Sequence, residues 1–409
     1  MARSTASSSG RLTRTIGDER ALPTRVYLDY GGFALVDPRV LAVMQPFLEG
    51  GVGNPSALHS LGSEARQSLE AARVKVARLL GGSAGGIIFT SGATEASNLA
   101  IKGVALRAAK AGGHVVTASV EHISVLNPCR DLEKAGFAVT YLPVDGEGRV
   151  DPDALARAIR PETVLVSIQA ANPEIGTLQP VAALARVTRQ HNVPFHVDAV
   201  GAAGRIPLLA DELGIDLVSL SANDLYGPPG AGALWVRPGV KLLPQILGGG
   251  QEGGYRSGTE NLPAIVGMGV AAELARVEGP AEARRLTGLR DRLIAGVLAE
   301  VPECRLTGSR TERLPHHVSV CLRGAKADGV LMDLDLAGVA AASGSACASK
   351  TLEPSHVLRA IGCDPEEAEG SLCFTLGRWT GAPEIEAVLA LLPPIVRRLR
   401  ALAPPRPVN

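Results

Sequence analysis

Residues 87–95 read Ile-Ile-Phe-Thr-Ser-Gly-Ala-Thr-Glu and pass from a short apolar run through a turn of small residues into a helical pattern. Such a run, bounded by turn residues, is typical of a buried strand in a parallel sheet. Free backbone N–H groups in the turn, a Thr hydroxyl and a helix N-terminus can together hold a phosphate. A capped helix start without a ligand is the other interpretation, and the turn alone does not decide between them.

The same alternation of apolar runs and helical patterns extends on both sides of this stretch. Upstream, residues 63–80 place apolar side chains on one helical face, and Gly81 and Gly82 end that helix. The predicted strands are residues 87–90, 115–118, 139–142, 164–168, 194–198, 217–220 and 232–236. Repeated strand–helix–strand units predict an α/β fold with a mainly parallel seven-stranded sheet in a large domain.

The pattern changes near Gly279 and Pro280. A long helix rich in Arg and Leu, a strand at 318–322, a loop of small residues and an amphipathic helix at 383–402 follow. We therefore expect three parts, a disordered tail over residues 1–25, a large α/β domain over 41–281, and a smaller α+β domain made of 26–40 with 282–409. The tail lacks the apolar run of a secretory signal.

Composition excludes several classes of protein. Lys plus Arg and Asp plus Glu are both 41, so no bulk basic field attracts nucleic acid or an anionic membrane. No stretch approaches the roughly 18 apolar residues of a membrane helix. Six cysteines without short repeated spacing suit a reducing compartment, so we expect a cytoplasmic protein without a metal site.

Two polar residues follow predicted strands at the edge where open α/β sheets bind ligands. Asp198 ends the run Phe195-His196-Val197, and it is either a hydrogen-bonded structural carboxylate or one that holds a protonated ring nitrogen. His122 follows the strand at 115–118, and it either stacks on a planar ligand or forms local hydrogen bonds at the surface.

One thiol, Cys347, lies in a loop of small residues at 343–350. It is either a reachable, reactive thiol or an inert small hydrophobe. Four other cysteines read as structural, and three histidines lack the companions of a metal site and read as solvated or locally bonded. These residues are Cys129, Cys304, Cys321 and Cys363, and His316, His317 and His356.

From about Tyr27 to Leu402 the chain resembles the cysteine desulfurases, of the class V aminotransferase group with the type I pyridoxal-phosphate fold. The matching segments are Tyr27-Leu28-Asp29-Tyr30, Gly53-Asn54-Pro55-Ser56 with His59, residues 91–95 with Asn98, Glu121-His122, Glu174-Ile175-Gly176, His196-Val197-Asp198-Ala199, Tyr226-Gly227-Pro228, residues 256–261, residues 343–347 and Leu352-Glu353-Pro354-Ser355. In that family a lysine holds pyridoxal phosphate as a Schiff base, and a loop cysteine takes sulfur from the substrate as a persulfide.

The resemblance implies a role for each matching residue. Phosphate would be held by Ala93, Thr94, Ser221 and Thr259, the pyridinium by Asp198, the ring face by His122, and sulfur by Cys347. It also implies a homodimer, because the segment at 256–261 typically reaches the phosphate of the partner subunit.

Several positions depart from the family pattern around one pocket. Asn223 and Asp224 stand where the family has His and the Schiff-base lysine, and Cys373 stands where an Arg grips the substrate carboxylate. Pro173 and Gly201 replace an Asn and a Gln that contact the cofactor. None of the seven lysines is expected on the pocket floor, so we do not expect covalent attachment of pyridoxal phosphate.

Three functions remain open from the sequence. Cys347 carries or transfers a persulfide to an acceptor, on a scaffold that no longer draws sulfur from cysteine. Alternatively, the chain is a pseudoenzyme scaffold or a partner of a sulfur-transfer or biosynthetic system. In the third hypothesis the pocket is repurposed, either with Asp224 as general acid or base, or with pyridoxal or pyridoxamine phosphate bound noncovalently. An enzyme of this kind would be a transferase or lyase.

Overall fold

The structure is a computed structural model that describes residues 25–50, 53–108, 112–344 and 355–402. The predicted N-terminal tail, except for Arg25, lies outside these residues. Most of the loop of small residues, including Cys347, also lies outside them.

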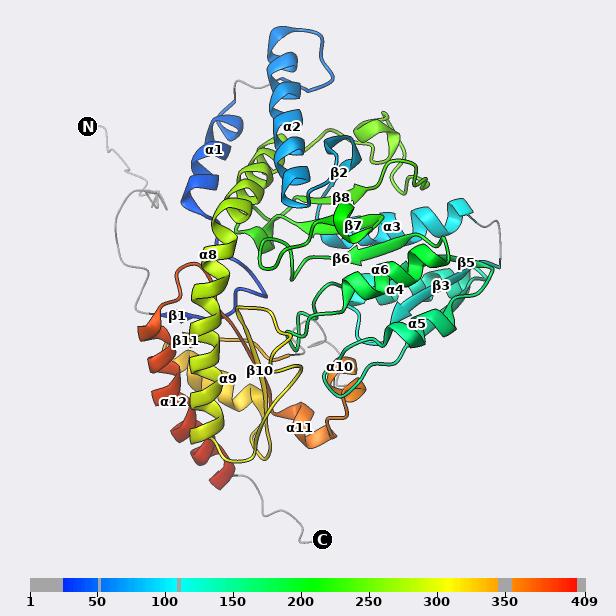
Figure 1. Ribbon diagram of the computed structural model, residues 1–409. Helices are drawn as coiled ribbons and strands as arrows, with labels where there is room; N and C mark the ends of the chain where they lie inside the picture. Colours follow the sequence, from blue (N-terminus) through cyan, green and yellow to red (C-terminus); the bar gives the residue numbers. More distant parts are fainter. Residues whose placement is uncertain (1–24, 51–52, 109–111, 345–354, 403–409) are drawn as a thin grey trace, which may run out of the picture.

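A seven-stranded sheet in the order β2-β8-β7-β6-β5-β3-β4 forms the large layer (Figure 1). Its strands are β2 (Ile87–Thr90), β3 (His114–Ala118), β4 (Ala138–Leu142), β5 (Thr163–Ser167), β6 (Phe195–Asp198), β7 (Leu217–Ser221) and β8 (Gly232–Val236). Only β8 runs antiparallel to its neighbours, while β4, β3, β5, β6 and β7 are parallel. The predicted mainly parallel seven-stranded sheet is confirmed.

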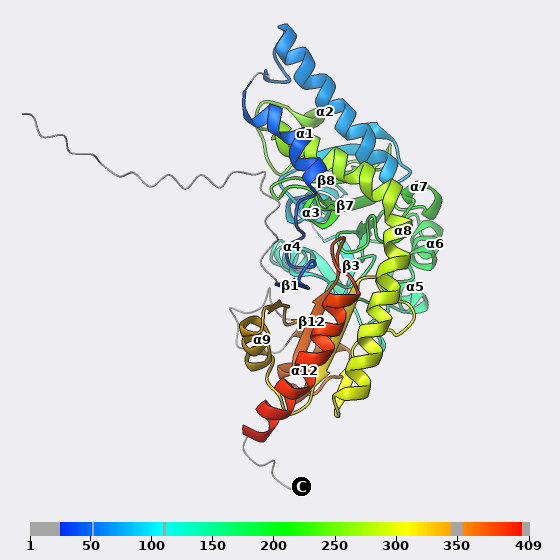
Figure 2. The same ribbon diagram turned by 90° about the vertical axis from the view of Figure 1, so that its left-hand side faces the viewer.

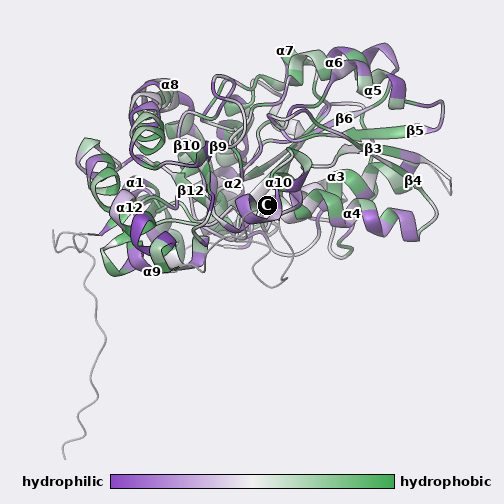
Figure 3. Cartoon of the chain, turned by 90° about the horizontal axis from the view of Figure 1, so that it is seen from below, coloured by the Kyte–Doolittle hydropathy of each residue, from purple (hydrophilic) through white to green (hydrophobic). Residues whose placement is uncertain are grey.

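Helices cover both faces of this sheet, because successive strand residues point to opposite sides. Ile88 packs with α3 (Ala93–Ala108) and α4 (Ile123–Lys134), whereas Ile87 and Phe89 pack on the opposite face. That second face is covered by α1 (Pro38–Leu48), α2 (Ser60–Leu79), α5 (Pro152–Ala158), α6 (Val181–Gln190), α7 (Ala210–Leu213) and the first half of α8 (Leu262–Glu300). Viewed from below, the sheet strands are mainly apolar, and polar residues lie along the outer helices (Figure 3).

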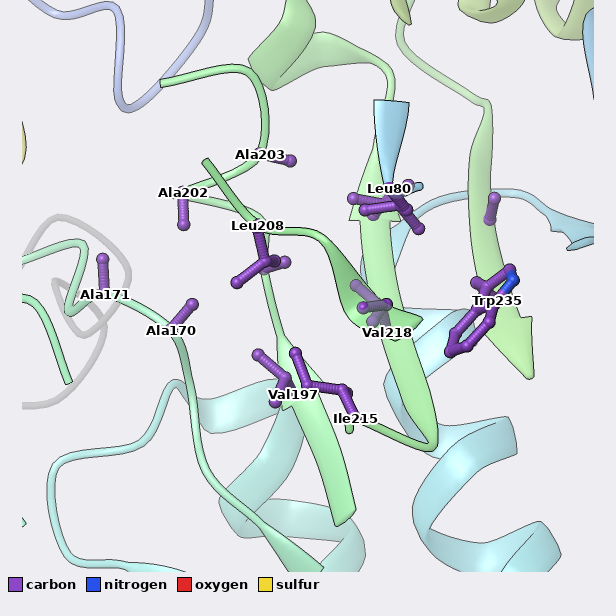
Figure 4. Packing of buried hydrophobic residues seen from close by; sticks show 14 of the residues in the cluster. Leu80, Ala170, Ala171, Val197, Ala202, Ala203, Leu208, Ile215, Val218 and Trp235 are labelled. Carbon is purple, nitrogen blue, oxygen red and sulfur yellow. The ribbon is translucent and has the colours of Figure 1, made fainter. Parts of the chain in front are cut away.

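The core on this face is tightly packed. Figure 4 shows Val197, Val218 and Trp235 on three neighbouring strands, with Leu208 and Ile215 close by. Trp235 is fully buried, and its indole N–H donates to the carbonyl of Ser83 at 3.2 Å. Gly86 is required beside it, because a Cβ there would lie 2.4 Å from the Val236 carbonyl oxygen.

A second, smaller sheet, which contains β12, lies beside the C-terminal helix α12 (Figure 2). It has its own hydrophobic core. Its order is β12-β10-β9, and a short parallel pair, β1-β11, lies beside it. The elements here are β1 (Val26–Tyr27), β9 (Cys304–Leu306), β10 (His317–Leu322), α9 (Ala327–Leu336), β11 (Val339–Ala340), α10 (His356–Ala360), α11 (Pro365–Glu369), β12 (Ser371–Thr375) and α12 (Ala382–Leu402). The predicted strand near 318–322 and the helix near 383–402 are confirmed.

The change of pattern at Gly279 and Pro280 does not begin a new helix. Helix α8 runs unbroken across both residues, and the predicted domain boundary at 281 falls inside it. Gly279 fits a close backbone contact, since a Cβ there would lie 2.5 Å from the Gly204 carbonyl oxygen. Pro280 costs one helical hydrogen bond, which packing on both sides of the helix outweighs. The division into two domains stays a prediction.

Among the described residues, no helix combines the length and the apolar character needed to cross a membrane.

A buried ion cluster joins the two cores. Glu282 on α8 pairs with Arg205 at 2.7 Å and with Arg378 at 3.2 Å, and it also accepts a hydrogen bond from the Tyr226 hydroxyl at 2.6 Å. Arg378 also pairs with Asp37, the N-cap residue of α1. One carboxylate thus connects α8, the segment after β6, the turn after β7 and the segment after β12.

Replacement of Glu282 tests the weight of this cluster. We expect Glu282→Gln to lower the free energy of unfolding by about 3 kcal/mol, because Arg205, whose side chain is 8% exposed, loses its carboxylate partner, while Arg378 keeps Asp37 and Glu278. Urea denaturation at pH 7 measures the change. Glu386→Gln is the matched control, since Glu386 pairs with Arg292 at an exposed site and should cost under about 1 kcal/mol. Equal effects of the two variants would contradict this reading.

Candidate functional site

A cavity of about 490 Å³ lies between the carboxyl ends of the large-sheet strands and the small sheet. The residues that follow β2, β3, β5, β6 and β7 line one side, and segments near β10, β11 and β12 line the other. This is the edge where the sequence predicts ligand binding.

The turn at the start of α3 faces the cavity. Ala93 and Thr94 line it, and a Cβ on Gly92 would meet open space. The first N–H groups of α3 have no partner inside the helix. Glu95 fixes the turn, because it accepts the Ser91 N–H at 2.8 Å and pairs with Arg256 at 3.0 Å. Burial alone would raise the pKa of Glu95, but these contacts outweigh burial and lower it.

Asp198, the last residue of β6, is 7% exposed and lines the cavity. Its side chain accepts a hydrogen bond from the Val200 N–H at 3.1 Å, and burial raises its pKa. His122 lies close enough to interact with it electrostatically, and burial lowers the pKa of that imidazole. Within the described part of the chain, Asp198 has no Arg or Lys partner, so a protonated ring nitrogen would be a suitable one.

Asp224 lies in a short turn, Asn223–Leu225, directly after β7 and faces the same cavity. Burial raises its pKa to about 6, although a hydrogen bond with Ser221 and the charge of Arg205 oppose the rise. Of the described lysines, none lines the cavity. The hydroxyl of Ser221 is therefore engaged by Asp224, and one of the predicted phosphate contacts already has a partner.

Six of the eight predicted site residues converge on the cavity: Ala93, Thr94, His122, Asp198, Ser221 and Asp224. Thr259 does not, because it is exposed and does not line the cavity of this chain. Cys347 lies outside the described residues, so its environment stays a prediction.

Three histidines that were expected to be solvated or locally bonded line the cavity instead. Nε2 of the half-buried His356 donates to the Glu121 carbonyl at 2.9 Å, and His316 and His317 are buried. The Nε2–H of His317 donates to the Pro173 carbonyl at 2.8 Å, and Nε2 lies 3.3 Å from the sulfur of Cys373. Burial lowers the pKa of the His316 and His317 imidazoles, that of His317 to about 3. One indication in the sequence was that His316 and His317 directly precede the strand predicted at 318–322. The pairing of that strand with β12, which brings them to the cavity, is not visible in the sequence.

Unpartnered polar atoms concentrate at the cavity. Seven buried side-chain polar atoms of the described residues lack a hydrogen-bond partner, and four of them belong to cavity-lining residues. These four are Glu174 Oε1, Asn223 Oδ1, His316 Nδ1 and His317 Nδ1. Buried polar groups normally find partners, so the concentration indicates that a polar ligand completes this site.

Acidic groups outnumber cations around the cavity. Arg205 is the one Arg or Lys among the described lining residues, and Glu282 already pairs with it. Burial raises the pKa of five lining carboxyl groups, those of Asp29, Glu121, Glu174, Asp198 and Asp224. The arrangement therefore suits ligands with protonated nitrogens.

The chain is similar to a known protein family. Residues 26–387 match the family model described as aminotransferase class-V. The chain is 47% identical to cysteine desulfurase IscS 1 of Archaeoglobus fulgidus, over 92% of this chain and 98% of that protein. It is also 47% identical to cysteine desulfurase IscS of Dictyoglomus turgidum, over 93% and 96%.

A solved structure of a NifS-like protein superposes with a TM-score of 0.86 at 36% identity, covering 91% of this chain and all of that one. The type I pyridoxal-phosphate fold expected from the resemblance is confirmed.

The raised pKa of Asp224 predicts a pH dependence of stability. An aspartate that keeps its proton up to about pH 6 when folded, but loses it near 3.8 when unfolded, favours the unfolded state as pH rises between these values. We expect the free energy of unfolding of Asp224→Asn to rise relative to that of wild type by roughly 2–3 kcal/mol as the pH goes from 4 to 6. Above pH 7 this difference should stay constant. Chemical denaturation from pH 4 to pH 8 measures it, with the exposed Asp153→Asn as control. A pH-independent difference would show that Asp224 titrates normally.

Proposed function

The chain belongs to the aminotransferase class-V family, and from that membership we propose that it is a desulfurase-type protein with a repurposed pocket. The pocket binds a phosphorylated pyridoxamine noncovalently, and Asp224 serves as its hydrogen-bonding and acid–base group. The protein does not release sulfur from free cysteine through a lysine-bound cofactor.

One observation carries this proposal. Asp224 occupies the turn after β7 and faces the same cavity as Asp198, while no described lining residue is a lysine. The family depends on pyridoxal phosphate, whose aldehyde bonds to an amine. A carboxyl group cannot form that bond, but a carboxylate pairs well with an ammonium group. The residue at this position therefore favours the amine form of the ligand over the aldehyde form.

The rest of the cavity supports the same ligand. The turn at residues 91–94 offers N–H groups and the Thr94 hydroxyl to a phosphate. Asp198 offers a buried carboxylate to a protonated ring nitrogen, and His122 lies on the same wall. When bound, such a ligand supplies an aromatic ring that withdraws electrons from an attached group.

Asp224 has the properties of an acid–base group in this setting. A pKa of about 6 lies close to neutrality, so the carboxyl group can both accept and return a proton under ordinary conditions. Ser221 orients it by a hydrogen bond, and Arg205 stabilises its charged form.

The other sequence-based hypotheses stay predictions. Persulfide transfer through Cys347 to an acceptor protein involves a residue outside the described part of the chain. The scaffold role, the homodimer and the cytoplasmic location are likewise predictions, as is a contribution of Thr259 to a phosphate site.

Ligand titration tests the proposal. We expect pyridoxamine phosphate to shift the near-ultraviolet spectrum saturably, because Asp224 and Asp198 pair with its two protonated nitrogens. With pyridoxal phosphate and borohydride we expect no stable adduct at the pocket, whereas Asp224→Lys gains one that peptide mass spectrometry maps to residue 224. Asp153→Lys, at an exposed helix start, is the control for nonspecific lysine reaction.

Two results would overturn it. One is a wild-type protein that releases sulfide from cysteine with added pyridoxal phosphate. The other is a folded wild-type protein that leaves the spectrum of pyridoxamine phosphate unchanged.

A further inference from the structure

The small-sheet side of the cavity carries a second acidic region, which we call the acidic wall and define as Asp29, Glu174 and Cys373. Cys373 lies in the middle of β12, and Asp29 follows β1 and bridges to Thr375, two residues further along the same strand. Glu174 comes from the loop after β5. All three residues line the cavity. Burial, then the charges of Asp29 and Glu174, raise the pKa of the Cys373 thiol.

Neither carboxyl group of the acidic wall has a cationic partner among the described residues. Asp29 takes a hydrogen bond from the Gly32 backbone, and Glu174 takes one from the Ser355 side chain. Oε1 of Glu174 has no partner at all. Burial raises the pKa of both groups, that of Glu174 to about 8.

The nearest cations are engaged elsewhere. Arg313 is buried and donates to the backbone carbonyls of Ser309, Thr307 and His317, and it does not line the cavity. Arg205 is paired with Glu282. His316 and His317 are neutral because burial lowers the pKa of each.

Glycines keep the two carboxyl groups uncovered. A Cβ on Gly32 would lie 2.7 Å from an oxygen of Asp29, and a Cβ on Gly344 would lie 2.9 Å from Oε1 of Glu174. Independently, His316 is 6% exposed and lines the cavity, and its Nδ1 lacks a partner. Among the described residues, the cavity thus presents open acceptors on this side and no free cation.

We propose that the acidic wall receives a protonated primary amine, and that the substrate class of the cavity is a small amine without a carboxylate rather than an α-amino acid. An ammonium group carries three hydrogen-bond donors and a positive charge, and it can therefore be the cationic partner that Asp29 and Glu174 lack. A substrate carboxylate would face two carboxyl groups, and no described residue on this side offers a compensating cation. The inference rests on the proposed use of the cavity for ligand binding, but not on the identity of the phosphorylated ligand.

Paired ligands that differ only by a carboxylate test the proposal. Calorimetric titration of the full chain at pH 7.5 compares cysteamine with L-cysteine, and putrescine with L-ornithine, each with and without saturating pyridoxamine phosphate. We expect each amine to bind at least tenfold more tightly than its amino acid. Asp29→Asn and Glu174→Gln should each weaken amine binding at least fivefold and leave pyridoxamine phosphate binding unchanged.

A gain of charge supplies the converse test. Cys373→Arg places a cation in the acidic wall and should reverse the preference within each pair, while Cys304→Arg, on β9 away from the cavity, should not. Cys373→Ser adds no charge to the wall and should retain the preference for amines, which guards against a Cys373→Arg variant that does not fold. Thermal melting confirms folding of each variant.

The proposal is overturned if wild type binds the amino acids as tightly as the amines, or if it binds neither under either condition. If the protein prefers amines but does not bind pyridoxamine phosphate, this inference holds and the phosphorylated ligand of the proposed function is wrong. If the protein binds pyridoxamine phosphate but shows no preference for amines, only this inference is wrong.

Discussion

The pairing of Glu282 with two buried arginines is the constraint on which the site depends. The cavity lies between the core of the large sheet and the core of the small sheet, and this cluster connects the two. Arg205 reaches Glu282 from the large-sheet side, and Arg378 reaches it from the small-sheet side. Because Arg205 also stabilises the charge of Asp224, the same cluster that joins the cores sets the electrostatics of the pocket.

That pocket keeps its carboxyl groups at an energetic cost. Five of them have raised pKa values, and Arg205, the one arginine among the described lining residues, is already paired. Such a site is less stable without a ligand than with one, because partners for buried polar atoms must come from outside the chain. The two ends differ: the α3 end offers N–H groups to an anion, and the acidic wall offers acceptors to a cation.

Much of the large sheet was predictable, because each strand is a short apolar run between turn residues, as at 87–90. The residues after these strands were predictable too, since parallel strands share one edge, and Asp198, His122 and Asp224 do meet there. Continuity of α8 was not, because Gly and Pro normally end helices and their tolerance here depends on contacts across the fold. His316, His317 and Cys373 become neighbours through β10–β12 pairing, which local sequence does not encode.

The unbroken course of α8 has a mechanical consequence. Its 39 residues form a rod of about 58 Å, whose first half belongs to the core of the large sheet and whose second half belongs to the core of the small one. Rotation of one core against the other has no flexible linker in α8 to absorb it. It must bend the rod, and the weakest point is Pro280, where a backbone hydrogen bond is missing. A change in the width of the cavity between the two cores is therefore coupled to a change in the curvature of α8.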